Sequence, residues 1–138
     1  MICYAIIDTN VLVSALLSRN SDAATVQVVA RTIEGEIIPV YSKEIMKEYY
    51  EVLHRKKFKF DPTLVDTLLA AIEKYGTLVV PYGTGTVFSD AKDLQFYEVL
   101  TEKRKDNAYL VTGNLKHFTT EPFIVTARQL LEILDVNS

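Results

Sequence analysis

The sequence predicts an α/β protein in which a parallel β-sheet lies between two layers of helices. Short apolar runs alternate along the chain with longer segments that have helical spacing. The apolar runs are continuous, as in strands that are buried on both faces, and do not alternate with polar residues. Right-handed crossovers between such strands produce a doubly wound, three-layer α/β/α sandwich.

The composition is that of one soluble globular domain over residues 1–138. Hydrophobic residues make up 49% and charged residues 24% of the chain. No run approaches the roughly 20 apolar residues of a membrane span, and the N-terminus lacks the basic region of a signal peptide. The single cysteine, Cys3, excludes an internal disulfide and a cysteine-based zinc site, so we expect a cytoplasmic protein. The formal net charge of −3 gives no overall basic field for nucleic acid.

The helix boundaries are predicted from capping residues and glycines. Gly35 and Gly76 are expected to end the helices that precede them. The expected caps are Ser21 or Asp22, then Ser42, then Asp61 with Pro62 behind it. The expected elements are strand 2–7, helix 11–17, helix 23–34, strand 37–40, helix 43–53, helix 62–75, strand 78–80, helix 93–105, strand 108–112, strand 123–125 and helix 126–134.

Three acids and one amide are expected near the carboxyl ends of the strands, where ligands bind in such sheets. Asp8 follows the first strand and Asn114 the fourth, so their side chains meet if these strands flank the point where strand order reverses. Glu48 lies in the helix after the second strand, and Asp93 opens the helix before the fourth. Clustered carboxylates repel one another unless a cation neutralises them, and oxygen ligands suit Mg²⁺ or Mn²⁺. Such an ion activates water and polarises a phosphoryl oxygen, which favours phosphodiester hydrolysis.

Each of these four residues also has a purely structural interpretation. Asp8 can cap a helix, and Glu48 can lie on a solvated helix face. Asp93 can be a helix cap, with Asp90 as the competing candidate, and Asn114 can form a turn after a glycine. The functional interpretation gains weight because one topology brings all four residues to the same end of the sheet.

Four blocks of the sequence resemble, in order, the signature blocks of PIN-domain ribonucleases: IIDTNVLVSALL, SKEIMKEYYEVLHRKKF, DAKDLQFYEVL and YLVTGNLKHF. The resemblance covers essentially the whole chain and is greatest to the toxins of VapC-like toxin–antitoxin pairs. It implies a PIN-like fold with a five-stranded parallel sheet in the order 3-2-1-4-5. It also implies a metal-dependent ribonuclease that forms a homodimer and binds an antitoxin protein.

By position, the resemblance makes Asp8, Glu48 and Asp93 the catalytic acids that hold Mg²⁺ or Mn²⁺. Asn114 stands where many PIN nucleases have a fourth acid. Its amide oxygen is a weaker ligand and brings no charge, so a second metal ion should be harder to bind. The residues that match supporting hydroxyl and amide positions beside the acids are Thr9, Asn10 and Thr112.

A run of basic and aromatic residues, HRKKFKF over 54–60, is a candidate RNA-binding segment. Cationic side chains neutralise phosphates, and aromatic rings stack on unpaired bases. The alternative is a solvated helix end whose two phenylalanines, Phe58 and Phe60, are buried in the core. The candidate RNA-binding residues are Arg55, Lys56, Lys57, Lys116 and His117.

Two functions compete with RNA hydrolysis. One is phosphotransfer through an aspartyl phosphate at Asp8. A haloacid-dehalogenase-type phosphatase would require a second aspartate two residues after Asp8, and this chain has Asn10 at that position. A receiver-like protein would require an acid at the end of the third strand, which lacks one. The other competitor is a PIN scaffold that binds RNA or protein without catalysis, and Asn114 is the residue that favours it.

Overall fold

The computed structural model describes residues 3–80, 91–118 and 121–136, with the backbone alone at 91–93. At its centre is a five-stranded parallel sheet in the order β3-β2-β1-β4-β5, which confirms the predicted fold class and strand order. The strands are β1 (Cys3–Ile7), β2 (Ile37–Tyr41), β3 (Thr77–Leu78), β4 (Tyr109–Val111) and β5 (Ile124–Val125).

Strand β1 occupies the middle of the sheet and pairs with β2 on one side and with β4 on the other. Ile7, at the carboxyl end of β1, aligns with Val111 at the carboxyl end of β4. Because the strand order reverses between these two strands, the residues that follow them lie at the ligand-binding edge of the sheet.

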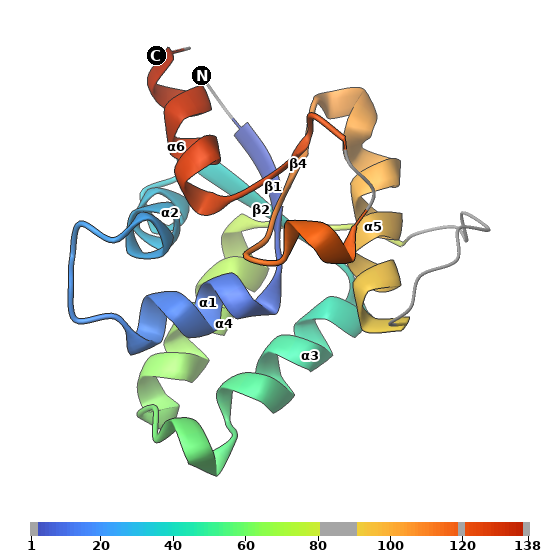
Figure 1. Cartoon of the computed structure of the whole chain (residues 1–138). Coiled ribbons are helices and arrows are strands. Elements are labelled where there is room, and N and C mark those ends of the chain that lie inside the picture. Colours follow the sequence, from blue (N-terminus) through green and yellow to red (C-terminus); the bar gives the residue numbers. More distant parts are fainter. Residues whose placement is uncertain (1–2, 81–90, 119–120, 137–138) are drawn as a thin grey trace.

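Helices cover both faces of the sheet, and Figure 1 shows α5 on one side of it and α2 with α6 on the other. An ion pair of 3.0 Å between Arg31 and Asp135 joins α2 to α6. Within the described residues, no helix is long and apolar enough to cross a membrane. The helices are α1 (Thr9–Leu17), α2 (Ala24–Ile33), α3 (Lys43–Leu53), α4 (Pro62–Tyr75), α5 (Ala91–Lys103) and α6 (Ala127–Val136).

The core lies between the sheet and its helices, and it consists of the continuous apolar runs of the sequence. Ile6, Val40 and Leu110, from three neighbouring strands, are fully buried. Helix α4 contributes an apolar face made of Val65, Leu68, Leu69 and Ile72. Burial on both faces of the sheet explains why these strands do not alternate polar with apolar residues.

Two of the predicted helix caps are confirmed, and one is wrong. The Oγ of Ser42 accepts a hydrogen bond from the Ile45 N–H (3.1 Å), and the side chain of Asp61 accepts one from the Thr63 N–H (2.9 Å). The cap of α2 is instead Ala23, which makes no side-chain capping bond. The expected caps, Ser21 and Asp22, lie in the turn before α2 and take part there through their backbone. The Ser21 carbonyl accepts a hydrogen bond from the Gln27 side chain of α2, and the Asp22 N–H donates to the Asn20 side chain.

Several element boundaries differ from those predicted. Helix α1 begins at Thr9 rather than at residue 11, directly after β1. Strand β3 pairs only through Thr77 and Leu78, although the expected strand was 78–80. β3 is an edge strand that pairs only with β2, and beyond this pairing the Val79 N–H still donates to the Tyr41 carbonyl (2.8 Å). The expected loop at 82–86 lies outside the described residues.

Helix α4 ends at Gly76, as predicted, because the chain passes very close to other backbone there. The Gly76 N–H donates to the Ile72 carbonyl (2.8 Å). A Cβ atom at this position would lie 2.4 Å from the Ile72 oxygen and 2.6 Å from the Pro39 oxygen of β2. Glycine is therefore required here because a side chain would clash with neighbouring backbone, and not because the backbone adopts a left-handed conformation.

Cys3 lies inside β1 and is only 4% exposed. Burial, with a smaller contribution from the negative charge of Glu36, raises the pKa of the thiol to about 11. At neutral pH the sulfur is therefore protonated and weakly nucleophilic.

Candidate functional site

Asp8 lies between β1 and α1, at the carboxyl edge of the sheet. It occupies the N-cap position of α1, but its side chain makes no capping hydrogen bond. Its Oδ2 accepts hydrogen bonds from the Thr112 hydroxyl (2.7 Å) and from the Asn10 amide (3.1 Å). The side chain is buried, and its bond to Thr112 crosses from β1 to the end of β4. Helix capping therefore does not explain the carboxylate.

The two side chains that hold Asp8 are themselves fixed by the backbone after β4. The Gly113 N–H donates to the Asn10 Oδ1 (3.1 Å), and the Asn114 N–H donates to the Thr112 Oγ1 (3.0 Å). The hydroxyl of Thr112 thus donates to a carboxylate while it accepts from the backbone, which fixes its proton on the Asp8 side. This network connects the ends of β1 and β4 and sets the direction of the Asp8 carboxylate.

Glu48 extends from α3 toward the same edge and is held by two other helices. Its Oε2 accepts a short hydrogen bond from the Thr9 hydroxyl of α1, and its Oε1 accepts one from the Gln95 amide of α5 (3.0 Å). Its side chain is half-buried. Both carboxylate oxygens therefore have protein donors, an arrangement that a solvated helix-face residue would not have.

Tyr49, next to Glu48, forms the buried support of the site. Its hydroxyl donates to the carbonyl of Ile7, the last residue of β1, and its ring packs against Phe96 with 6.5 Å between ring centres. Burial, together with the negative charges of Asp8 and Glu48, raises the pKa of Tyr49 well above its ordinary value. The phenol consequently remains a hydrogen-bond donor at physiological pH.

A hollow of about 320 Å³ opens beside these side chains. It brings together the predicted residues Asp8, Glu48 and Asn114 and two of the candidate RNA-binding residues, Arg55 and His117. Its lining comprises Asp8, Thr9, Asn10, Val13, Glu48, Val52, Arg55, Phe58, Phe96, Asn114 and His117. The remaining described basic candidates, Lys56, Lys57 and Lys116, are exposed and lie outside this lining.

Some residues of the basic and aromatic segment make structural contacts, and others line the hollow. His54 ends α3, where its ring contacts the Tyr50 carbonyl (2.7 Å) and Asp66 (2.9 Å). Phe58 and Phe60 stack on each other at 5.3 Å with an angle of 9° between their planes, and both are half-buried. Phe58 lines the hollow, so the segment is not simply a solvated helix end with both phenylalanines in the core.

Asp93 lies in the first turn of α5, but its side chain is outside the described part of the structure, as is Asp90. Among the described residues, no group of three His, Cys, Asp or Glu side chains could hold a metal ion. The described donors at the hollow, Asp8, Glu48 and Asn114, offer oxygen atoms. Hard divalent cations such as Mg²⁺ and Mn²⁺ take oxygen ligands, so the donor set fits such an ion.

Gln95 and Tyr49 belong to the site, although sequence reasoning did not find them. Gln95 follows Asp93 by two positions, and Tyr49 follows Glu48 directly. A neutral amide and an aromatic ring on helices have no chemical signature in a sequence. The only available signal was their closeness to the predicted acids.

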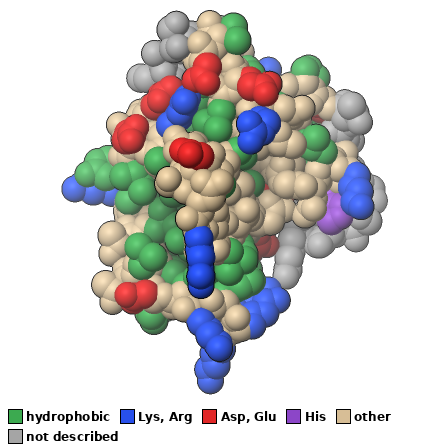
Figure 2. All heavy atoms as spheres, turned by 60° about the vertical axis from the view of Figure 1, so that its left-hand side comes forward, with side chains coloured by type: hydrophobic (Ala, Val, Ile, Leu, Met, Phe, Trp, Pro, Cys, Tyr) green, Lys and Arg blue, Asp and Glu red, His purple; other side chains and the backbone are tan. Residues whose placement is uncertain are grey.

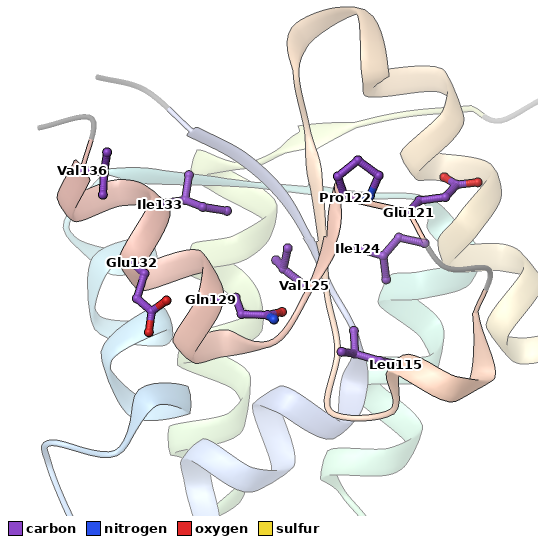
Figure 3. Close-up of a pocket in the computed structure, with 9 residues that line it drawn as sticks. All are labelled: Leu115, Glu121, Pro122, Ile124, Val125, Gln129, Glu132, Ile133 and Val136. Carbon is purple, nitrogen blue, oxygen red and sulfur yellow. The ribbon is translucent and has the colours of Figure 1, made fainter.

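A larger hollow of about 600 Å³ lies between the β5 edge and α6 (Figure 3). Its lining is mostly apolar and includes none of the predicted site residues; it comprises Leu115, Glu121, Pro122, Ile124, Val125, Gln129, Glu132, Ile133 and Val136. Figure 2 shows that apolar side chains also reach the surface among charged ones on the side that carries α2 and α6.

The parallel sheet with its reversal between β1 and β4, and the polar cluster at that point, define an α/β protein with the strand order of PIN domains. A family model for the PIN domain matches residues 4–116, and the chain belongs to this family. PIN domains are generally nucleases and typically use divalent metals, so membership implies a nucleic-acid substrate. Comparisons with curated proteins and with solved structures gave no match.

Proposed function

We propose that this PIN domain is a metal-dependent ribonuclease that hydrolyses RNA phosphodiester bonds, and that it acts as the toxin of a toxin–antitoxin pair. One observation carries the enzymatic part of the proposal. The carboxylates of Asp8 and Glu48 line one hollow at the carboxyl edge of the sheet, and separate hydrogen-bond networks hold them there. Such a pair is costly to bring together unless a cation is bound between them.

In this proposal, Asp8, Glu48 and Asp93 hold a Mg²⁺ or Mn²⁺ ion, and Asn114 adds a weaker ligand through its amide oxygen. When bound, the ion supplies Lewis-acid polarisation of the phosphoryl oxygen and a more acidic water. Thr112 and Asn10 keep the Asp8 carboxylate turned toward the hollow. Glu48, which is half-buried beside that hollow, orients the attacking water.

The lining of the hollow also carries side chains with the chemistry to bind the RNA chain. Arg55 is exposed and lines the hollow, and it takes part in none of the ion pairs found among the described residues. Its guanidinium is therefore available to a phosphate. His117 lies on the same lining, and the ring of Phe58 offers a surface on which a base can stack. Lys56, Lys57 and Lys116 add positive charge outside the hollow.

The expected result of a cleavage assay is metal-dependent hydrolysis of RNA. Purified protein is incubated with end-labelled RNA in Mn²⁺, in Mg²⁺ and in excess chelator, beside Asp93→Asn and the exposed control Asp22→Asn. Cleavage should disappear with chelator and fall by at least about 10- to 100-fold in Asp93→Asn, the loss typical of weakened metal sites. The control should match the wild type.

Three outcomes contradict this proposal. Cleavage that persists in chelator would exclude a metal-dependent reaction. RNA binding without cleavage in either metal would support the scaffold function. Acid-labile phosphate on Asp8 would indicate phosphotransfer instead of hydrolysis.

Asn114→Asp is expected to strengthen Mn²⁺ binding, because it places a fourth negative charge on the lining of the hollow. The expected gain is about fivefold in affinity, or about 1 kcal/mol. Titration of the free protein, with unbound Mn²⁺ followed by electron paramagnetic resonance, measures the change. Asn20→Asp, in an exposed turn, is the matched control. Unchanged or weaker binding by Asn114→Asp would show that this position does not face the ion.

The partner proteins in this proposal rest on the resemblance of the four sequence blocks to VapC-like toxins. We infer a homodimer and an antitoxin protein that covers the acidic hollow, both in the cytoplasm. Exposed apolar side chains such as Ile33 and Val136 supply surface for association. A small antitoxin-like gene next to the gene for this chain would support the toxin role.

A further inference from the structure

The carboxylate of Glu48 is fixed by side chains from two different helices. A glutamate has three rotatable side-chain bonds, and a free one samples many orientations. Here Thr9 of α1 holds one oxygen, and Gln95 of α5 holds the other at 3.0 Å. Because the two donors belong to separate elements, the plane of the carboxylate is set by the packing of α1 and α5 around α3.

The donors that hold Glu48 are neutral. Within the described parts of the chain, no Lys, Arg or His forms an ion pair with Glu48. A hydroxyl and an amide orient the carboxylate without adding a positive charge that would compete with a bound cation. Each carboxylate oxygen has two lone pairs, so one on each oxygen remains after these bonds.

The position of Gln95 is itself fixed by the residue that follows it. Phe96 is 1% exposed and packs against Tyr49, the neighbour of Glu48 on α3. The polar pair Gln95–Glu48 and the aromatic pair Phe96–Tyr49 thus lie side by side at the α3–α5 contact. Asp93 precedes Gln95 by two positions in the first turns of α5, so the same contact fixes the helix end that carries the third proposed acid.

We propose that Gln95 is a positioning residue whose carboxamide holds the Glu48 carboxylate in the orientation that serves a divalent cation. This inference rests on the proposed function of the site. Gln95 also lines a second hollow, of about 360 Å³, with Ser42 and Glu98. Gln95 does not line the acidic hollow itself but reaches it through its bond to Glu48. Without the Gln95 amide, the Glu48 carboxylate would be held by Thr9 alone and could turn about that bond.

The first test is Mn²⁺ binding by the free protein without RNA, which uses the Gln95→Leu variant. Leucine removes the donor and retains most of the side-chain volume. Mn²⁺ affinity is expected to fall about tenfold, at the lower end of the loss seen when a partner of a metal ligand is removed. In the cleavage assay, kcat should fall by a similar factor while KM for RNA stays within about twofold. Thr101→Val, on the same helix, is the control and should change neither value.

A double-mutant cycle with Glu48→Gln separates positioning from a general structural effect. If Gln95 acts through Glu48, adding Gln95→Leu to Glu48→Gln should cause no further loss of Mn²⁺ affinity. Additive losses would overturn the proposal. Should Gln95→Leu lower the melting temperature, Gln95→Met, which keeps an unbranched side chain, takes its place in the cycle.

The outcomes for Gln95 and for the nuclease are distinguishable. Wild-type protein that binds Mn²⁺ but cleaves no RNA would overturn the proposed function and leave the Gln95 result intact. Wild-type cleavage with unchanged Mn²⁺ affinity and kcat in Gln95→Leu would overturn only the role of Gln95. Wild-type protein that binds no Mn²⁺ at all would overturn the role of Gln95 whatever the RNA assay shows.

Discussion

Asp8→Asn is expected to lower kcat/KM for RNA by at least about 100-fold, the upper end of the loss found for weaker perturbations of metal sites. Asparagine has nearly the same shape and can still accept the hydrogen bond from Thr112. It removes the negative charge of a proposed metal ligand that is only 7% exposed, where a cation would depend most on its protein ligands. Initial rates measured over a range of Mn²⁺ concentrations would separate lost affinity from lost turnover.

A companion variant, Thr112→Val, tests whether the charge or the orientation of Asp8 dominates. Valine keeps the volume and the Asp8 charge but removes the hydroxyl that donates to Oδ2 and accepts from the Asn114 N–H. We expect a loss of about tenfold, smaller than that of Asp8→Asn. Melting curves of both variants establish that they are folded. Wild-type activity in Asp8→Asn would remove this carboxylate from the mechanism.

Gly76→Ala is expected to destabilise the protein by about 3 kcal/mol, at the upper end of the cost of overpacking. The added Cβ would lie within 2.6 Å of two carbonyl oxygens, one in α4 and one in β2. Both are backbone atoms and cannot rotate away, so the end of α4 must move from the sheet. The melting temperature should fall by roughly 10 °C for a chain of this length.

Gly35→Ala is the matched control for Gly76→Ala. Gly35 has a φ of +91° and open space where a Cβ would be placed, so alanine there meets backbone strain without a clash. The expected cost is about 1–2 kcal/mol. A smaller effect at Gly76 than at Gly35 would show that α4 can shift at little cost.

The sheet could be predicted because its strands are unbroken apolar runs. In a chain of this size, a short run such as AII in β1 indicates a strand that is buried on both faces. Ser42 and Asp61 were found as caps because the bonds that they make are local. Ser21 and Asp22 were assigned wrongly because a turn and a helix start favour the same residue types, and here both residues lie in the turn that precedes the cap Ala23. The length of β3 depends on which neighbours it has, and propensity does not contain that information.

The residues of the candidate site also fall into those that the sequence could predict and those that it could not. Asp8, Glu48 and Asn114 could be placed at one edge because strand ends and chain order restrict where they lie. Gln95 could not, because its role depends on a partner 47 residues away on another helix. Tyr49 could not be recognised either, because a tyrosine on a helix is not distinguishable in sequence from an ordinary core residue, and Tyr49 is also part of the core. Its hydroxyl acquires a role only because the Ile7 carbonyl faces it.

The bond between Asp8 and Thr112 joins residues that are 104 positions apart. Strand β4 fills the place beside β1 that no earlier strand occupies. During synthesis on the ribosome, the first part of the chain can therefore form β1, β2 and their helices while the acidic site lacks one wall. If the chain cuts RNA as proposed, its topology delays activity until β4 has emerged, which protects the RNA of the ribosome that is making it.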